Sequence, residues 1–204
     1  MMRVVVMISG SGSNLQALVD AQHEGRLNAQ IVGVICDQPR AYGVERATKA
    51  GIPTICVPLP KGATRHEWAQ VISNILEVLH PDLIVMAGWM RIMPPSFVER
   101  WSPNLINQHP ALLPETTSDT YITSNGCEIP AIRGAHAVRD ALRLSVPVTG
   151  CTIHHVTAEV DVGPVLARAE VPILPDDSES SLHERIKQQE HRLIVQVINE
   201  LSIE

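Results

Sequence analysis

Two polar residues end a short apolar run in the segment NLINQHPALLP, residues 104–114. On a β-strand, side chains two positions apart point to the same side, so the amide of Asn107 and the imidazole of His109 should project together. Asp161, in AEVDVGPV, is expected on a loop between two strands and could pair with His109. An aspartate beside an imidazole favours the imidazolium form and fixes the orientation of the ring.

Together these side chains would supply an amide donor for a developing oxyanion and an acid–base pair, which acyl transfer or hydrolysis requires. A single histidine is more often a hydrogen-bonded structural residue, and the second carboxylate favours the catalytic interpretation. The sequence has no GxSxG motif and no cysteine in a catalytic setting, so we do not expect a covalent acyl-enzyme.

A glycine-rich turn, SGSGSN at residues 9–14, lies between the first apolar run and a helical pattern. Glycines at such a turn let backbone N–H groups approach an anion at the positive end of the helix. A dinucleotide site is an alternative, because Asp37 ends the second strand near the spacing of a ribose-binding acid. However, Leu15 occupies the third glycine position, and Ser13 and Asn14 offer side-chain donors, which favours a single phosphate.

Nine histidines raise the question of a metal site. His183 and Glu184 begin like a zinc-peptidase motif, but Lys187 stands where the second histidine is needed. His154 and His155 are adjacent on a strand and point to opposite faces, so they cannot readily share a metal. We therefore predict no metal.

The elements that position these residues alternate between strands and helices. The pattern predicts strands at 3–9, 31–36, 54–57, 83–87, 105–107, 148–156 and 165–171, with the clearest helix beginning at Thr64 and a long final helix at 181–201. Such alternation predicts an α/β fold in which a mainly parallel sheet carries helices on both faces. The polar segment 115–131 interrupts the rhythm, and its composition predicts a mobile lid or a disordered insertion.

Composition narrows the class of protein further. The 204 residues suit one domain, and 45% hydrophobic against 19% charged residues is typical of a chain with a sizeable core. A formal net charge of −6 argues against nucleic-acid binding through phosphate neutralisation. Neither a membrane-spanning run nor a signal-like start is present. Three of the four widely spaced cysteines lie in apolar, strand-like surroundings, which indicates reduced, buried thiols rather than a disulfide or a zinc site. We therefore expect a cytoplasmic protein that does not associate with a membrane.

Four segments resemble the phosphoribosylglycinamide formyltransferase family, in the right order and over nearly the whole chain. They are ISGSGSNLQALVDA, AGWMRIM, INQHPALLP and DVGPVLAR, at residues 8–21, 87–93, 106–114 and 161–168. The resemblance implies a Rossmann-like, three-layer fold. It also implies transfer of a formyl group from 10-formyltetrahydrofolate, as co-substrate, to the amine of glycinamide ribonucleotide in purine biosynthesis. The partners would be small molecules, and a homodimer is compatible with the family.

The resemblance also implies roles for individual residues. Asn107 would polarise the formyl oxygen, His109 would manage proton transfer, and Asp161 would orient and charge His109. The ribonucleotide would be held by Gly12, Ser13, Asn14, Lys187 and Glu190. The folate would be held by Trp89, Met90, Arg91, Ile92, Met93, His154, Ala158, Glu159 and Val160.

The sequence departs from the family after Pro114, where the family has a short step into an aromatic-Pro-Gly turn. Here the insertion intervenes and the turn reads Ile-Arg-Gly, residues 132–134. The Arg-Gly-Ala form is closer to formyltransferases that act on methionyl-tRNA or on amino sugars, which share the Asn-His-Asp centre.

Three further alternatives remain at this stage. A methionyl-tRNA formyltransferase would need a C-terminal RNA-binding domain, whereas we expect this acidic chain to end with its last helix. A formyltetrahydrofolate hydrolase would carry an N-terminal regulatory domain, whereas we expect this chain to begin with its first strand. A non-catalytic nucleotide-binding module would use the glycine turn but not Asn107, His109 or Asp161.

Overall fold

The apolar runs of the sequence assemble into one seven-stranded sheet with the order β3-β2-β1-β4-β5-β8-β9. The structure is a computed structural model and describes residues 1–115 and 117–203. Strands β1 to β5 run parallel, β8 is antiparallel to β5, and β9 is antiparallel to β8. The mostly parallel α/β sheet that the alternation predicts is confirmed. The strands are β1 (Met2–Ile8), β2 (Ala29–Cys36), β3 (Thr54–Cys56), β4 (Leu83–Met86), β5 (Leu105–His109), β8 (Val148–His155) and β9 (Val165–Pro172).

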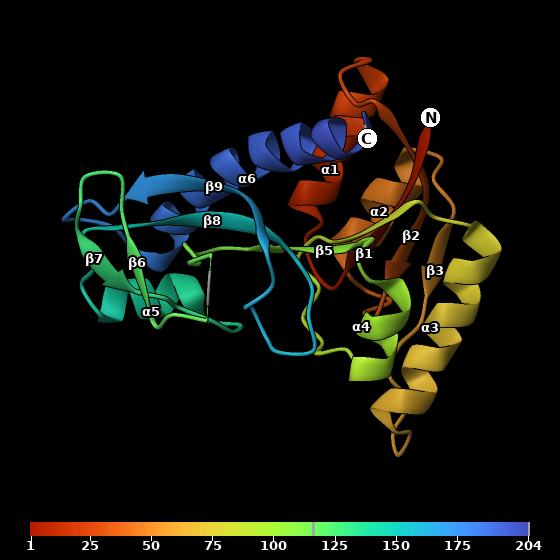
Figure 1. Cartoon of the computed structure of the whole chain (residues 1–204). Coiled ribbons are helices and arrows are strands. Elements are labelled where there is room, and N and C mark those ends of the chain that lie inside the picture. The colour runs from red at the N-terminus through yellow and green to blue at the C-terminus, as the bar shows by residue number, and fades with distance from the viewer. Residues whose placement is uncertain (116, 204) are drawn as a thin grey trace.

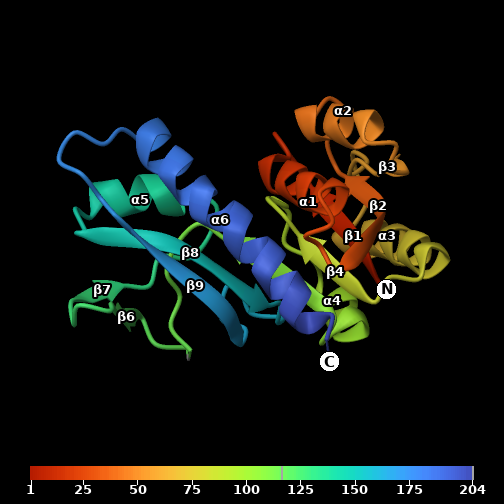
Figure 2. The same ribbon diagram turned by 90° about the horizontal axis from the view of Figure 1, so that it is seen from above.

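Helices cover both faces of this sheet because successive strand residues point to opposite sides. On one face, Val4, Val6 and Ile8 of β1 belong to a core with α1, α2 and α6, and on the other Val5 and Met7 pack with α3 and α4 (Figures 1 and 2). The helices are α1 (Ser13–His23), α2 (Tyr42–Lys49), α3 (Arg65–Leu79), α4 (Pro95–Trp101), α5 (Ala137–Arg143) and α6 (Glu179–Leu201).

Helix α3 begins where the sequence predicts it. The side chain of Thr64 accepts a hydrogen bond from the amide of Glu67, and the Glu67 carboxylate accepts one from the amide of Thr64, which closes a capping box. Trp68, Ile72 and Leu76 are buried on the inner side of this helix.

The polar insertion contains more regular structure than the sequence predicts. Strands β6 (Thr120–Ile122) and β7 (Glu128–Pro130) form an antiparallel hairpin at the end of the molecule occupied by α5 (Figure 1). Ile129 is buried in a small core with α5, and Tyr121 packs against it. Of the two alternatives, a mobile lid or a disordered insertion, the described hairpin does not support the second; two three-residue strands are too short to produce a readable pattern in the sequence. The mobility of this segment stays a prediction, and its residue Thr116 lies outside the described residues.

The hairpin is anchored to the main sheet through Glu170 of β9. The carboxylate of Glu170 accepts hydrogen bonds from the amide and the hydroxyl of Ser124, both at 2.7 Å, and from the hydroxyl of Tyr121 at 3.4 Å. These contacts lower the pKa of Glu170, the hydroxyl of Ser124 most of all.

The four cysteines are free thiols, but they are not all buried. Cys36 and Cys151 lie in the core, Cys127 is partly buried, and Cys56 is exposed. The expectation of buried thiols is wrong for Cys56 because β3 is the edge strand of the sheet.

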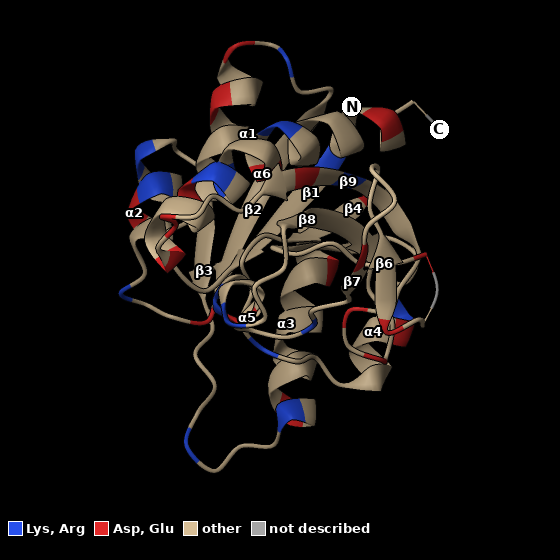
Figure 3. Ribbon diagram, turned by 90° about the vertical axis from the view of Figure 1, so that its left-hand side faces the viewer, with Lys and Arg blue, Asp and Glu red and all other residues tan. Residues whose placement is uncertain are grey.

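Charge is distributed over the helices and connections, with both signs interspersed, while the strands are largely uncharged (Figure 3). Helix α2, for example, contains both signs of charge, in Glu45, Arg46 and Lys49. Within the part of the chain that the structure describes, no helix combines the length and the apolar character needed to cross a membrane.

Candidate active site

A cavity lies at the carboxyl ends of the parallel strands, where open α/β sheets bind ligands. It has a volume of about 530 Å³ and is walled by the glycine turn, the segments after β4 and β5, the loop between β8 and β9, and one side of α6. The structure brings every residue predicted for the site to this cavity. They are Gly12, Ser13, Asn14, Trp89, Met90, Arg91, Ile92, Met93, Asn107, His109, His154, Ala158, Glu159, Val160, Asp161, Lys187 and Glu190.

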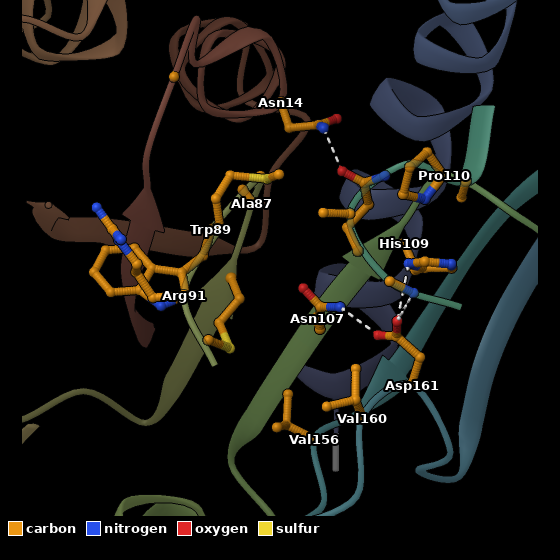
Figure 4. A pocket seen from close by; sticks show the side chains of 18 of the residues that line it. Asn14, Ala87, Trp89, Arg91, Asn107, His109, Pro110, Val156, Val160 and Asp161 are labelled. Atoms are coloured by element: carbon orange, nitrogen blue, oxygen red, sulfur yellow. Dashed lines mark hydrogen bonds and ion pairs between the residues drawn. The ribbon is translucent and has the colours of Figure 1, made fainter. Parts of the chain in front are cut away.

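Asn107 and His109 project from the same face of β5 and meet Asp161, which comes from the β8–β9 loop (Figure 4). Nδ1 of His109 lies 3.4 Å from one carboxylate oxygen of Asp161. Nδ2 of Asn107 lies 3.5 Å from the other oxygen and 3.2 Å from Nε2 of His154. The three side chains thus converge although they are separated by up to 54 positions in the sequence.

Asp161 is held in a backbone conformation that few residues adopt. Its φ is +56°, in the left-handed region, and its carboxylate accepts a hydrogen bond from the amide of Gly134 at 2.9 Å. Burial would raise the pKa of Asp161, but the hydrogen bond with His154, the nearby ring of His109 and the Gly134 amide lower it to about 2. Asp161 is therefore ionised at neutral pH.

The ring of His109 is buried, and this burial favours its neutral form. Nε2 donates a hydrogen bond to the carbonyl oxygen of Ile132 at 2.8 Å, so the neutral ring turns the lone pair of Nδ1 toward Asp161. Burial lowers the pKa of His109, and the opposing effect of Asp161 is smaller. Asp161 favours the charged imidazole, as expected, but the loss of solvation is the larger effect, so the net shift of the pKa is downward. At neutral pH His109 is poised to accept a proton.

The glycine turn presents the start of α1 to the cavity. Gly12 has a φ of +69°, and a Cβ atom there would lie 2.6 Å from the Cα atom of Gly43 in α2, so only glycine fits. The first amides of α1 have no partner within the helix and can donate to an anion. The side chain of Asn14, predicted as a phosphate donor, instead donates to Glu190 at 3.1 Å and to Gln108.

The geometry agrees with what comparison of the sequence finds: residues 2–198 match the formyl transferase family. This chain belongs to the formyl transferase family.

The resemblance noted in the sequence is thereby confirmed, and relatives within the family support it at full length. The chain is 40% identical over 200 residues to the phosphoribosylglycinamide formyltransferase of Mycobacterium tuberculosis, covering 98% of this chain and 85% of that protein. The Escherichia coli enzyme of the same name is 35% identical, with coverages of 97% and 86%. The crystal structure of glycinamide ribonucleotide transformylase 1 from Symbiobacterium toebii superimposes with a TM-score of 0.88 at 36% identity, over 99% of this chain and 88% of that one.

Longer proteins also contain a segment similar to this chain. The proteins named trifunctional purine biosynthetic protein adenosine-3 from Drosophila melanogaster and Homo sapiens are 39% and 37% identical over 191 residues. The chain spans 13% and 17% of their lengths, and 93% and 94% of its own length is matched.

The departure of this family member at Arg133 has a clear structural consequence. The guanidinium donates to the carbonyl oxygen of Ser118 at 2.7 Å and to that of Asp161 at 3.3 Å. Arg133 therefore ties the first part of the insertion to the loop that carries Asp161.

Some of the residues in the cavity wall at 89–93 make packing and ion-pair contacts with the rest of the protein. Trp89 is mostly buried and stacks on Trp68 with ring centroids 5.7 Å apart, whereas Met90 and Ile92 are exposed at the rim. Nε of Arg91 lies 2.6 Å from the buried carboxylate of Asp37. This ion pair accounts for Asp37, which the dinucleotide alternative would have assigned to a ribose.

Reasoning from the sequence missed Gln108, which lies between the two polar residues of β5 and lines the same cavity. It is 6% exposed and contacts Asn14 and Glu190. A glutamine on the face of the strand that it shares with Ile106 was the signal that could have identified it.

Proposed function

We propose that this formyl transferase family member transfers the formyl group of 10-formyltetrahydrofolate to the amine of glycinamide ribonucleotide, a step of purine biosynthesis. The observation that carries the proposal is the convergence of Asn107, His109 and Asp161 in a cavity that also contains the amide-rich start of α1. The names of the relatives that match the chain at full length support the same substrates.

The proposed reaction is a direct attack by the acceptor amine. Its nitrogen lone pair forms a bond to the formyl carbon, and the carbonyl electrons move onto oxygen, where Nδ2 of Asn107 donates a hydrogen bond. Nδ1 of His109 takes the proton that the amine releases, and Asp161 stabilises the resulting imidazolium. When the tetrahedral intermediate collapses, the carbon–nitrogen bond to the folate breaks and His109 returns the proton to the leaving nitrogen. The step needs no metal ion, because these side chains supply both the oxyanion donor and the proton carrier.

The two substrates would occupy opposite parts of the cavity. The ribonucleotide phosphate is assigned to the amides at Gly12, Ser13 and Asn14, with Lys187 and Glu190 of α6 beside them. The folate is assigned to the wall after β4 and to the β8–β9 loop. Its contacts would come from Trp89, Met90, Arg91, Ile92, Met93, His154, Ala158, Glu159 and Val160.

The test compares folate turnover with and without the acceptor. We expect tetrahydrofolate to appear only when glycinamide ribonucleotide is present, with one formylated ribonucleotide per folate released. Turnover that is indifferent to the ribonucleotide would contradict the proposal and indicate a formyltetrahydrofolate hydrolase. Formylation of an amino-sugar nucleotide or of methionyl-tRNA in place of the ribonucleotide would reassign the acceptor.

The pH dependence provides a prediction about Asp161. Asp161→Asn is expected to lower kcat/KM by about 10²-fold and to move the acid limb of the pH profile to lower pH. The asparagine keeps an oxygen for the amide of Gly134 but removes the charge that raises the pKa of His109, so the base form of the ring persists to lower pH. The rate falls because the imidazolium formed during the reaction loses its counter-ion.

The measurement is kcat/KM from about pH 5 to 9 in both proteins. Because burial lowers the pKa of His109, we expect the wild-type acid limb below the ordinary histidine pKa of about 6.5. An acid limb at the same pH in both proteins would show that it does not report on His109.

A further inference from the structure

Gln108 lies between the two proposed catalytic residues of β5, but its side chain points to the other face of the sheet. Asn107 and His109 face the β8–β9 loop, whereas Gln108 shares the face of Ile106, which packs in the core with α1 and α6. Side chains alternate between the two faces of a strand, so consecutive residues of β5 can contact both the folate part and the ribonucleotide part of the cavity. Asn14, the partner of Gln108 on α1, borders the same cavity (Figure 4).

On that face Gln108 closes a buried hydrogen-bond network. Its Oε1 accepts from Nδ2 of Asn14, and its Nε2 donates to Oε1 of Glu190. Nδ2 of Asn14 also donates to Oε2 of Glu190 at 3.1 Å. Asn14 and Gln108 are each 6% exposed and Glu190 is 3% exposed, so these amides stand in for water around the carboxylate.

Among the described residues Glu190 forms no ion pair, and Lys187 acts on its charge without pairing with it, so its hydrogen bonds come from Asn14 and Gln108. Lys187, one turn earlier on α6, is paired with Glu184 at 2.7 Å. Cys151 of β8 is also affected by this carboxylate: burial and the Glu190 carboxylate raise the pKa of Cys151 to about 12, so it remains an uncharged thiol. Burial also raises the pKa of Glu190, while the amides of Asn14 and Gln108 and, to a smaller extent, the charge of Lys187 oppose that rise.

The network leaves one polar atom without a protein partner. Oδ1 of Asn14 is buried and has no hydrogen-bond partner among the described residues. Because Nδ2 of Asn14 is fixed by Gln108 and Glu190, this oxygen is held as an acceptor beside the carboxylate. Two adjacent acceptors suit the hydroxyl groups of a sugar.

We infer that Gln108 is a positioning residue for the ribonucleotide end of the acceptor, and that it acts by fixing the side chains of Asn14 and Glu190. This inference rests on the proposed function and assigns to β5 a second task besides carrying Asn107 and His109. Sugar recognition on one face of the strand and formyl transfer on the other are thereby set by consecutive residues.

The test replaces Gln108 by methionine, which keeps the unbranched shape and removes the amide. We expect KM for glycinamide ribonucleotide to rise about ten- to hundredfold, while kcat and KM for the folate stay within about twofold. Gln108→Asn, which keeps the amide but withdraws it by one carbon, is expected to raise the same KM. Ile106→Val, on the same face of the same strand, is the matched control and should leave KM unchanged.

Two further measurements separate positioning from a merely structural role. Without the Gln108 donor the pKa of Glu190 should rise further. As the pH is lowered, KM for the ribonucleotide should therefore begin to increase at a higher pH in the variant than in the wild type. Combined with Glu190→Gln, the methionine variant should lose much less than the product of the two single losses, since both act through one network.

The outcomes distinguish this inference from the proposed function. If the wild-type protein formylates no ribonucleotide, the proposed function is wrong. If the wild type is active but both Gln108 variants keep its KM, or the losses with Glu190→Gln multiply independently, the role of Gln108 is refuted. A lower melting temperature with an unchanged KM would also refute it, because Gln108 would then serve only the core.

Discussion

His109→Ala is expected to lower kcat for formyl transfer by about 10²–10⁴-fold, the range that a positioned acid–base group contributes. The ring is the proposed proton carrier, because burial lowers its pKa and leaves it neutral, with the lone pair of Nδ1 turned toward Asp161. KM values should change far less, since the imidazole takes part in proton transfer during the chemical step and contributes little to substrate binding. The measurement is single-turnover and steady-state transfer at saturating substrates.

A neighbouring histidine provides the matched control for this variant. His155 follows His154 on β8 but lies outside the cavity, and its Nδ1 donates to the carbonyl oxygen of Pro103 at 2.8 Å. His155→Ala should transfer the formyl group at nearly the wild-type rate. Undiminished transfer by a folded His109→Ala protein would rule out the catalytic role of His109 and favour a module that only binds nucleotides.

Asn107→Ala is expected to lower kcat by about 10²–10³-fold, as removal of an oxyanion donor does in acyl transfer. Its Nδ2 lies between His154 and Asp161, at 3.2 and 3.5 Å, so the amide is oriented before substrate arrives. An alanine leaves no donor for the oxygen that becomes negatively charged in the intermediate. Steady-state kinetics with each substrate varied in turn provides the measurement.

The control for this variant is Asn104→Ala, in the same segment, where the side chain is exposed. It should leave kcat unchanged. A loss in Asn107→Ala that appears only in KM for the folate would mean that the amide binds the ground state, and the oxyanion role would then be refuted.

Contacts between residues that are close in the sequence could be predicted for the site, whereas contacts between distant residues could not. The pairing of Asn107 with His109 follows from strand alternation alone, and the start of α1 follows from the glycine turn. The ion pair between Asp37 and Arg91 and the contacts of Gln108 join residues 54 to 94 positions apart, so no spacing rule could reveal them. The net direction of the pKa of His109 was missed for a similar reason, because burial is a property of the assembled cavity.

Some strands of the fold could likewise be predicted from the sequence, and others could not. Strands β1 and β4 are continuous apolar runs that packed helices cover on both faces, and such runs can be recognised in a sequence. Strands β6 and β7 have only three residues each, and their pairing depends on the turn between them and on Glu170.

The hairpin of β6 and β7 also shows how a catalytic domain can change at its rim during evolution. In the described structure its two strands pair only with each other, and it joins the seven-stranded sheet through side-chain contacts such as those of Glu170 in β9. Such a segment can be gained, lost or exchanged without rethreading the strand that carries Asn107 and His109. What a descendant would have to preserve are the anchors of the segment: Glu170 of β9, and the guanidinium of Arg133, which joins the acquired segment to the inherited aspartate loop.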